Sequence, residues 1–407
     1  MKILHIVHGY YPSIGGSQWM TKNISELLVS NYGDDVTVFT TVAHDVAYFW
    51  GASQTCLPAG MTIINEVKIR RFPVFNRVGK IRMLLAHTAH RLNLPYNDWL
   101  RTIYNGPLIF GMTKAIANSQ ADVIFATAFP LMHMYYAMAG AKQGNIPIIL
   151  AGAIHTADKL GYERKMMYHA IHEANAYIAL TRFEREHLIK RGIPGDKISV
   201  VGAGVYLEKF KQAHGDIIRQ KYGWDDKPVV AIIGKQGRRK RFDILLEAMP
   251  HVWRVHPHVQ FLIAGGHGGY SAEIERQIAN FSATQQEHVT VVYDFVEDEK
   301  PNILEACDIL VLPSSYESFG IVFVEAWSCK KPVVGANMGA VATVIDDGVD
   351  GLLFEYENSR SLAQAILTLL ADKIKRHAMG IAGYQKVKER YTWQIVTEKI
   401  RKVYLQT

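Results

Sequence analysis

Short apolar runs alternate with longer amphipathic segments along most of the chain. The runs at 2–7 and 123–126 are typical of buried parallel strands, because they are short and almost continuously apolar. Segments such as 18–30 place their apolar residues at helical spacing. The alternation restarts at 229–233 and continues to 352–354. This pattern predicts an α/β protein with two doubly wound parallel sheets, and therefore two Rossmann-like domains.

A pause in the alternation indicates the domain boundary. Residues 207–228 are polar and contain two turn signals, so they are predicted to form a linker. The predicted domains are then 1–206 on the acceptor side and 207–385 on the nucleotide side, with a ligand cleft between their facing strand ends. A helix at 386–407 would be free to cross back to the first domain.

Composition and charge narrow the class of protein. Hydrophobic residues make up 49% of the 407 residues, which suits a globular protein with large cores. Three scattered cysteines have no metal-ligand spacing, so a reducing compartment is expected and a zinc site is not. The first apolar run is too short for a signal peptide, and no run of 18 apolar residues exists, so a cytoplasmic location is expected. The net charge of +7 is compatible with anionic ligands, a membrane surface or nucleic acid.

One long stretch, 44–107, interrupts the regular pattern. It mixes aromatic with basic residues, and no Asp or Glu occurs between Val67 and Asn97. Within it, 78–87 is both basic and amphipathic. One interpretation is a peripheral membrane contact through 67–97 at the inner face of the membrane, or an anionic partner. A solvated basic face whose apolar side covers the core is equally open.

The stretch 309–329 carries the clearest chemistry. An apolar strand runs into a loop, and the loop runs into a helix too apolar for the surface. Glu317 lies in the loop and Glu325 in the apolar helix. Because a lone buried carboxylate is costly, Glu325 needs a partner. Sugar hydroxyls can donate to it, and a buried Arg or a helix N-terminus is the structural alternative.

A cationic loop follows the first strand of the second predicted domain. Residues 235–241 contain five cations, and their place between a strand and a helix indicates an anion site suited to a diphosphate. In the first domain, Gly15 and Gly16 open a helix and can admit a phosphate closely, although an ordinary tight turn has the same sequence. His155 follows a strand, at the edge where open sheets bind ligands, and a histidine that only packs there is an equally open interpretation.

A glycine-rich turn at 265–269 supports a different class of enzyme. It follows a strand but lacks the third glycine of the dinucleotide fingerprint. Asp294 ends the next strand, as a ribose-binding acid would, so an NAD-dependent dehydrogenase is one alternative. A basic membrane- or nucleic-acid-binding module is another. Asp-x-Asp is absent from the chain, so a metal-held diphosphate is not implied.

Taken together, these motifs resemble those of the retaining glycosyltransferase family 4 (GT4), which has the GT-B fold. The family's E-x7-E motif matches Glu317 and Glu325, with Phe319 and Gly320 between them, and its strand-end His matches His155. Its GR…K motif matches Gly234-Lys235 with Lys240, and its Gly-Gly pair is Gly15-Gly16. The chain departs from the family where Lys235 replaces Arg and Gln18 replaces Glu, which affects the fine geometry of the donor site.

The resemblance implies a metal-independent hexosyltransferase without a cofactor. The expected partners are a nucleoside-diphosphate sugar, with UDP-sugar first, and a saccharide or lipid-linked acceptor of polysaccharide or glycolipid biosynthesis; nucleic acid is not expected. Catalytic roles fall to Lys235, Lys240, Glu317 and His155. Donor-binding roles fall to Gly15, Gly16, Gly234, Asp294, Phe295, Val296, Ser318, Phe319, Gly320, Ile321, Val322 and Glu325.

Overall fold

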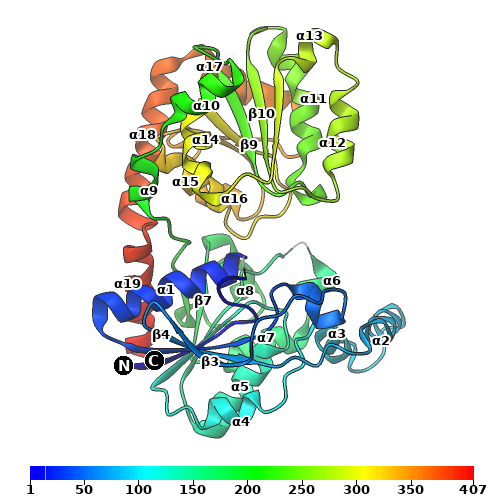
Figure 1. Ribbon diagram of the computed structural model, residues 1–407, viewed down its shortest axis with the longest axis vertical. Helices are drawn as coiled ribbons and strands as arrows, with labels where there is room; N and C mark the ends of the chain where they lie inside the picture. Colours follow the sequence, from blue (N-terminus) through cyan, green and yellow to red (C-terminus); the bar gives the residue numbers. More distant parts are fainter. Residues whose placement is uncertain (14, 157) are drawn as a thin grey trace. The chain divides into compact units, whose positions relative to one another are not determined.

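The computed structural model describes residues 1–13, 15–156 and 158–407. The chain forms two compact units, each with its own parallel-rich sheet (Figure 1). The first consists of Met1–Gly202 and Trp393–Thr407, and the second of Ala203–Thr392. The chain thus changes unit after residues 202 and 392, compared with the expected positions after 206 and 385.

The first unit contains an eight-stranded sheet in the order β3-β4-β2-β1-β5-β6-β7-β8. All neighbouring strands are parallel except β3 and β4, which form an antiparallel edge within the stretch expected to be irregular. The strands are β1 (Lys2–Ile6), β2 (Asp35–Thr41), β3 (Gly60–Ile64), β4 (Val67–Phe72), β5 (Val123–Thr127), β6 (Ile148–Ala151), β7 (Ala176–Ala179) and β8 (Ile198–Val200). The order doubles back beside β1, so the loops after β1 and β5 flank a topological switch point.

The helices of the first unit include the end of the chain. They are α1 (Gly16–Tyr32), η1 (Val46–Trp50), α2 (Gly79–Arg91), α3 (Asn97–Asn105), α4 (Met112–Ala117), α5 (His133–Gly144), α6 (Lys159–Tyr162), α7 (Lys165–Glu173), α8 (Arg182–Lys190), η2 (Gly195–Lys197) and α19 (Trp393–Gln406). Helix α19 is fixed beside β1, since Arg401 pairs with the buried Asp34 at 2.8 Å and the Tyr404 hydroxyl lies 3.1 Å from His5 Nε2.

The second unit contains a six-stranded parallel sheet in the order β11-β10-β9-β12-β13-β14. Its strands are β9 (Val229–Ile233), β10 (Gln260–Gly265), β11 (Val289–Tyr293), β12 (Ile309–Leu312), β13 (Val333–Ala336) and β14 (Gly351–Phe354). The chain builds outward from β9 on one side and then returns to place β12 on the other. The loops after β9 and β12 therefore meet at the switch point of this sheet, where open α/β sheets bind ligands.

Helices cover both faces of this sheet, with α11 and α12 on one side and α10 and α14 on the other (Figure 1). The full set is α9 (Leu207–Lys211), α10 (Gly215–Tyr222), η3 (Arg238–Lys240), α11 (Phe242–Trp253), α12 (Ser271–Ile278), α13 (Ala283–Gln286), η4 (Glu297–Glu299), α14 (Lys300–Ala306), α15 (Ile321–Ser328), α16 (Val341–Val344), α17 (Ser359–Ala371) and α18 (Lys373–Arg390). The prediction that 207–228 is a linker is wrong. Helix α10 packs on α14 so closely that a Cβ at Gly215 would lie 2.6 Å from the Glu305 carbonyl carbon, a tertiary contact that overrides the local polarity.

Three buried histidines in the first unit make its stability dependent on pH. Burial lowers the pKa of His5 to about 3, of His8 to about 3 and of His133 to about 4. Below pH 6.5 the unfolded chain binds protons that the folded unit does not, so stability present at pH 7 is lost as the pH falls. Each histidine contributes about 1.4 kcal/mol per pH unit of this loss.

We therefore expect urea unfolding at pH 5 to show a markedly lower free energy of unfolding than at pH 7. The variant His8→Asn should have a shallower pH dependence, whereas His377→Asn, at an exposed position, should keep the dependence of the unmodified protein. Equal stability at the two pH values would contradict the assignment.

Candidate functional site

The switch point of the second unit brings together two of the predicted catalytic residues. Lys240 ends the short turn η3 after β9, and Glu317 lies in the loop after β12. Lys240 Nζ donates to Glu317 Oε1 at 2.6 Å, although 77 residues separate them in sequence. The two side chains are 27% and 12% exposed, so the pair is partly withdrawn from water while it remains reachable. The site thus combines a cation with a carboxylate at the ligand edge of the sheet.

The backbone of the two loops is joined independently of this ion pair. The Arg239 carbonyl oxygen accepts from Ser314 Oγ at 3.0 Å, and from the backbone amide and Oγ of Ser315 at 3.0 and 3.1 Å. Three donors on one oxygen hold η3 against the loop that carries Glu317 and the half-buried Ser318. These serines end the strand β12, and their hydroxyls fix the distance between the cationic and acidic loops.

Glycines set how closely the turn after β9 packs. The side chain of Lys240 runs beside Gly234, where a Cβ would lie 3.4 Å from Lys240 Cε. A Cβ at Gly265, whose φ is 147°, would lie 2.0 Å from the Gly234 carbonyl oxygen. Gly265, the last residue of β10, therefore allows the backbone of the turn after β9 to pass closely. Lys235 is exposed and makes no ion pair with any residue that the structure describes.

Glu325 lies inside α15 and has a cationic partner that the sequence did not reveal. Its Oε1 accepts from Lys300 Nζ at 2.9 Å, and Lys300 also pairs with Glu297. Burial raises the pKa of Glu325, and the charge of Lys300 opposes this rise. Burial alone would lower the pKa of Lys300, but Glu325 and Glu297 raise it. Among the described residues Glu325 Oε2 accepts no hydrogen bond, so one oxygen is held and the other is available.

The loop after β12 ends in the N-terminus of α15. Gly320 precedes the helix with a φ of 83°, a left-handed conformation that favours glycine, and no side chain caps the helix there. Phe319 is buried and packs edge-on against Tyr391 at 5.3 Å between ring centroids. The first amides of the helix, at Ile321 and Val322, have no acceptor within the helix and attract anions. Main-chain groups are therefore what this segment offers to a ligand.

Asp294 organises the glycine turn after β10. Its Oδ1 accepts from the His267 amide at 2.9 Å, and its backbone has a φ of 46°. Both Asp294 Oδ1 and the Lys235 side chain lie against Gly266, within 3.5 and 3.8 Å of where a Cβ would be. Next in the chain, Phe295 is half-buried and Val296 is exposed. The Asp294 carboxylate therefore stabilises the turn itself, and one of its oxygens is already engaged by a backbone amide instead of a ribose hydroxyl.

The predicted residues of the first unit lie after β1 and β6. Gly15 packs against Gln18, since a Cβ at Gly15 would lie 2.4 Å from Gln18 Oε1, while a Cβ at Gly16 would meet no atom of the described residues within 4 Å. His155 packs edge-on against Tyr162 at 5.3 Å between ring centroids. Gly16 thus leaves open space at the start of α1, and His155 is positioned by an aromatic ring of α6.

Sequence reasoning missed a buried carboxylate that supports the His155 loop. Glu184 accepts from the Ile154 amide at 3.1 Å, from the Tyr177 hydroxyl at 2.7 Å and from the Leu180 amide at 2.8 Å. Burial raises its pKa, and these three donors oppose the rise. Glu184 therefore ties the ends of β6 and β7 together next to His155. Its sequence signal is only an acid in the first turn of α8, which also occurs in ordinary helices.

Across residues 1–13, 15–156 and 158–407, no group of three or more His, Cys, Asp or Glu side chains could hold a metal ion. Within the same residues, no helix is long and apolar enough to cross a membrane.

Comparisons of the sequence and of the fold with known proteins all point to glycosyltransferases. The family model for glycosyl transferases group 1 matches residues 215–386, and that for Glycosyltransferase Family 4 matches 14–209. A D-inositol 3-phosphate glycosyltransferase of Segniliparus rotundus is 29% identical over 324 residues, covering 79% of this chain and 67% of that protein. An alpha-maltose-1-phosphate synthase of Mycolicibacterium smegmatis is 26% identical over 366 residues, covering 80% and 92%. Among solved structures, Anabaena HepE in complex with UDP and glucose superposes with a TM-score of 0.71 at 20% identity, covering all of both chains.

The two sheet-based units and the structural likeness define a GT-B fold. The family models and the curated relatives then place the chain within that fold class: it belongs to glycosyltransferase family 4. The protein is accordingly an enzyme that transfers a glycosyl group. The dehydrogenase alternative, which depended on the glycine turn and Asp294, is set aside.

Proposed function

We propose that this enzyme transfers a hexose from a nucleoside-diphosphate sugar, with a UDP-sugar as donor, to a saccharide or lipid-linked acceptor. The observation that carries the proposal is the meeting of Lys240 and Glu317 at the switch point of the second unit. Such a pair offers a cation for a diphosphate and a carboxylate for a sugar hydroxyl. The complex of HepE with UDP and glucose supports a UDP-sugar as donor.

The diphosphate is proposed to bind Lys235, Lys240 and the N-terminal amides of α15. These groups would stabilise the negative charge that grows on the leaving diphosphate, without a metal ion. Backbone groups of Phe319 and Gly320 would lie beside them. Gly15 and Gly16 are proposed to admit donor phosphate or acceptor, and His155 to contact the transferred sugar.

The sugar-binding roles are proposed to fall to the two glutamates. Glu325, held through one oxygen by Lys300, would accept hydrogen bonds from the ribose hydroxyls on the other. Glu317 would accept from a hydroxyl of the transferred sugar. Backbone groups between Asp294 and Val296 would meet the base.

We further propose that the transfer retains the anomeric configuration by a front-face route. The acceptor oxygen bonds to the anomeric carbon on the side from which the diphosphate leaves, and an oxygen of the departing phosphate takes the hydroxyl proton. The two carboxylates of the site support this route because both are engaged by lysines in the structure. Trapping of a covalent glycosyl-enzyme would exclude it.

The proposal is tested by a screen of the purified protein against UDP-, GDP- and ADP-sugars that measures released nucleoside diphosphate. We expect slow hydrolysis of a UDP-sugar, and Glu325→Gln should lower its kcat/KM by about 10- to 100-fold, because a hydrogen bond to a charged group is lost. Glu389→Gln, at an exposed site of α18, serves as the control. Consumption of none of these donors would refute the function, and unchanged kcat/KM in Glu325→Gln would refute the ribose role.

A further inference from the structure

Helix α2 meets the first unit through small and polar side chains. Its buried residues are Gly79, Arg82, Ala86 and Ala89. A Cβ at Gly79 would lie 2.3 Å from the Trp50 carbonyl oxygen, so the helix starts directly on the end of η1. Arg82 donates to the Phe49 carbonyl oxygen, and burial lowers the pKa of its guanidinium. The inward face of α2 is thus held against η1 by close backbone packing and by the hydrogen bond of Arg82.

The outward face of the same helix is apolar. Ile81, Leu84 and Leu85 are 57%, 66% and 53% exposed, and their i, i+3, i+4 spacing places them on one stripe. A surface helix usually turns such a stripe toward the core. The alternative in which the apolar side of 78–87 covers the core is therefore wrong. Helix α2 also projects from the first unit on the side away from α19 (Figure 1).

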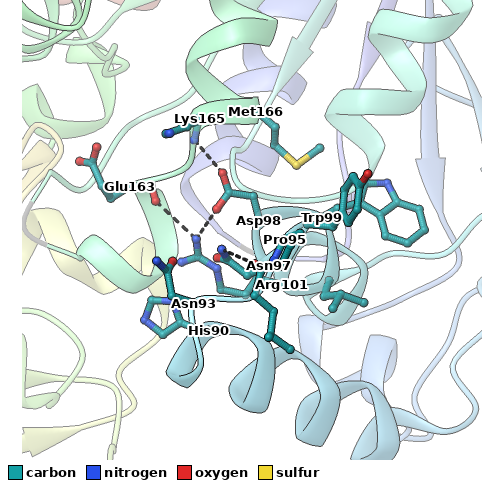
Figure 2. A pocket seen from close by; sticks show the side chains of 13 residues that line it. His90, Asn93, Pro95, Asn97, Asp98, Trp99, Arg101, Glu163, Lys165 and Met166 are labelled. Atoms are coloured by element: carbon teal, nitrogen blue, oxygen red, sulfur yellow. Dashed lines mark hydrogen bonds and ion pairs between the residues drawn. The ribbon is translucent and has the colours of Figure 1, made fainter.

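Exposed apolar side chains continue from α2 into α3. Seven exposed residues make up what we call the α2–α3 surface: Ile81, Leu84, Leu85, Leu92, Leu94, Tyr96 and Trp99. Its last three members also line a cavity of about 1230 Å³, together with His90, Asn93 and Met166 (Figure 2). Figure 2 shows Asp98 engaged by Arg101 and by the Lys165 amide. The second acidic residue of the cavity, Glu163, pairs with Arg191, so both carboxylates are already engaged.

The charges around the α2–α3 surface are cationic. The fold uses several basic residues of the 67–97 stretch: Lys68 pairs with Asp35, Arg71 donates to the Tyr11 carbonyl oxygen, and Arg82 is buried. Exposed cations of this stretch without an ion pair among the described residues are Arg70, Arg77, Lys80 and Arg91, of which Arg70 lies over the rings of Phe39 and Phe72. Residues 67–72 form strand β4 of the sheet. The part of the 67–97 segment that remains for the expected membrane contact is therefore 73–97.

We propose that the α2–α3 surface docks on an anionic lipid bilayer, with α2 lying in the plane of the interface. The helix has 13 residues, too few to span a bilayer but enough to insert one apolar stripe below the headgroups. Lys80 and Arg91 would meet lipid phosphates. A second copy of the chain fits less well, since Val67 to Asn97 contains no carboxylate to face these cations.

The test is co-sedimentation with vesicles of phosphatidylcholine alone and of phosphatidylcholine with about 30 mol% phosphatidylglycerol. We expect binding to the anionic vesicles, weakened by salt. The triple variant Ile81→Ser, Leu84→Ser, Leu85→Ser should bind at least about tenfold more weakly, because the apolar area that enters the interface is lost. Lys80→Gln with Arg91→Gln should lose the preference for the anionic vesicles.

A control with the same number of substitutions removes other apolar residues that are more than half exposed, in the triple variant Ile217→Ser, Val255→Ser, Ile374→Ser. It should bind like the unmodified protein. Nucleotide release without vesicles should be the same in all variants, so a failure of docking is distinguishable from a failure of the enzyme. Absence of binding to anionic vesicles, or equal binding by the α2 triple variant, overturns the proposal. A dimer that the α2 triple variant dissociates, without vesicle binding, would identify the surface as a self-association interface.

Discussion

Replacing Lys240 by alanine is expected to lower the kcat of sugar-nucleotide turnover by about 100- to 1000-fold. Loss of one preorganised group that stabilises transition-state charge typically has an effect of this size. The structure gives Lys240 two features for that role: it lies at the switch point of the sheet, and its side chain is 27% exposed beside Glu317. The measurement is nucleotide release under saturating donor, with the melting temperature recorded in parallel.

The control for Lys240 is Lys388→Ala, which removes an exposed lysine from α18 and should leave turnover unchanged. A double-mutant cycle with Glu317→Gln separates the ion pair from the action on substrate. If Lys240 served only to hold Glu317, the double variant would be no slower than Glu317→Gln alone. Turnover of Lys240→Ala within a factor of about two of the unmodified enzyme would contradict the assigned role.

The second large effect is expected on stability, from Lys386→Met. Lys386 is 8% exposed in α18 and donates to the Val344 carbonyl oxygen at 2.9 Å, and it pairs with Asp346 at 2.8 Å and with the buried Asp350. Burial raises the pKa of Asp350, and Lys386 opposes the rise. Removing the lysine leaves a buried carboxylate without its cation, so the unfolding free energy of the second unit should fall by about 3–5 kcal/mol.

Urea unfolding measures this change, and Lys388→Met, two residues further along α18, is the matched control. The double variant Lys386→Met, Asp350→Asn should be more stable than Lys386→Met alone, because the uncompensated charge is gone. If the unfolding free energy of Lys386→Met fell by less than about 1 kcal/mol, the ion pairs of Lys386 would contribute no more than ordinary surface pairs, which would contradict the prediction.

The sequence could predict elements and many site residues because their signals are local. Strands of the parallel sheets are short continuous apolar runs, and the structure confirms the strands β9 and β12 and the helix after Gly320 that these runs predict. The assignment of Glu317 and Lys240 to loops at strand ends required only the neighbouring residues. The region 44–107 was harder, since β3 and β4 form an edge hairpin in which β4 exposes Lys68 and Arg70 while β3 exposes the apolar Met61 and Ile63.

Contacts between residues far apart in the sequence could not be predicted from local sequence patterns. Glu325 needed a partner, but only packing selected Lys300, 25 residues away on α14. The polar stretch 207–228 lacked a core signal of its own, and α10 is fixed there by its contact with α14. Glu184 likewise gains its role from the ends of two strands that the sheet order places side by side.

The sequence by itself determined the α/β alternation, the two-sheet organisation and the chemistry of the loops that follow β9 and β12, because burial period and residue type are local properties. Only the tertiary structure decided which loops meet, since the strand order that puts β9 beside β12 is a non-local choice. It also decided which way α2 faces. That helix carries one stripe of large apolar residues and another built on Gly79, Ala86 and Ala89, and the small residues were selected for the core because they allow the helix to approach the backbone of η1.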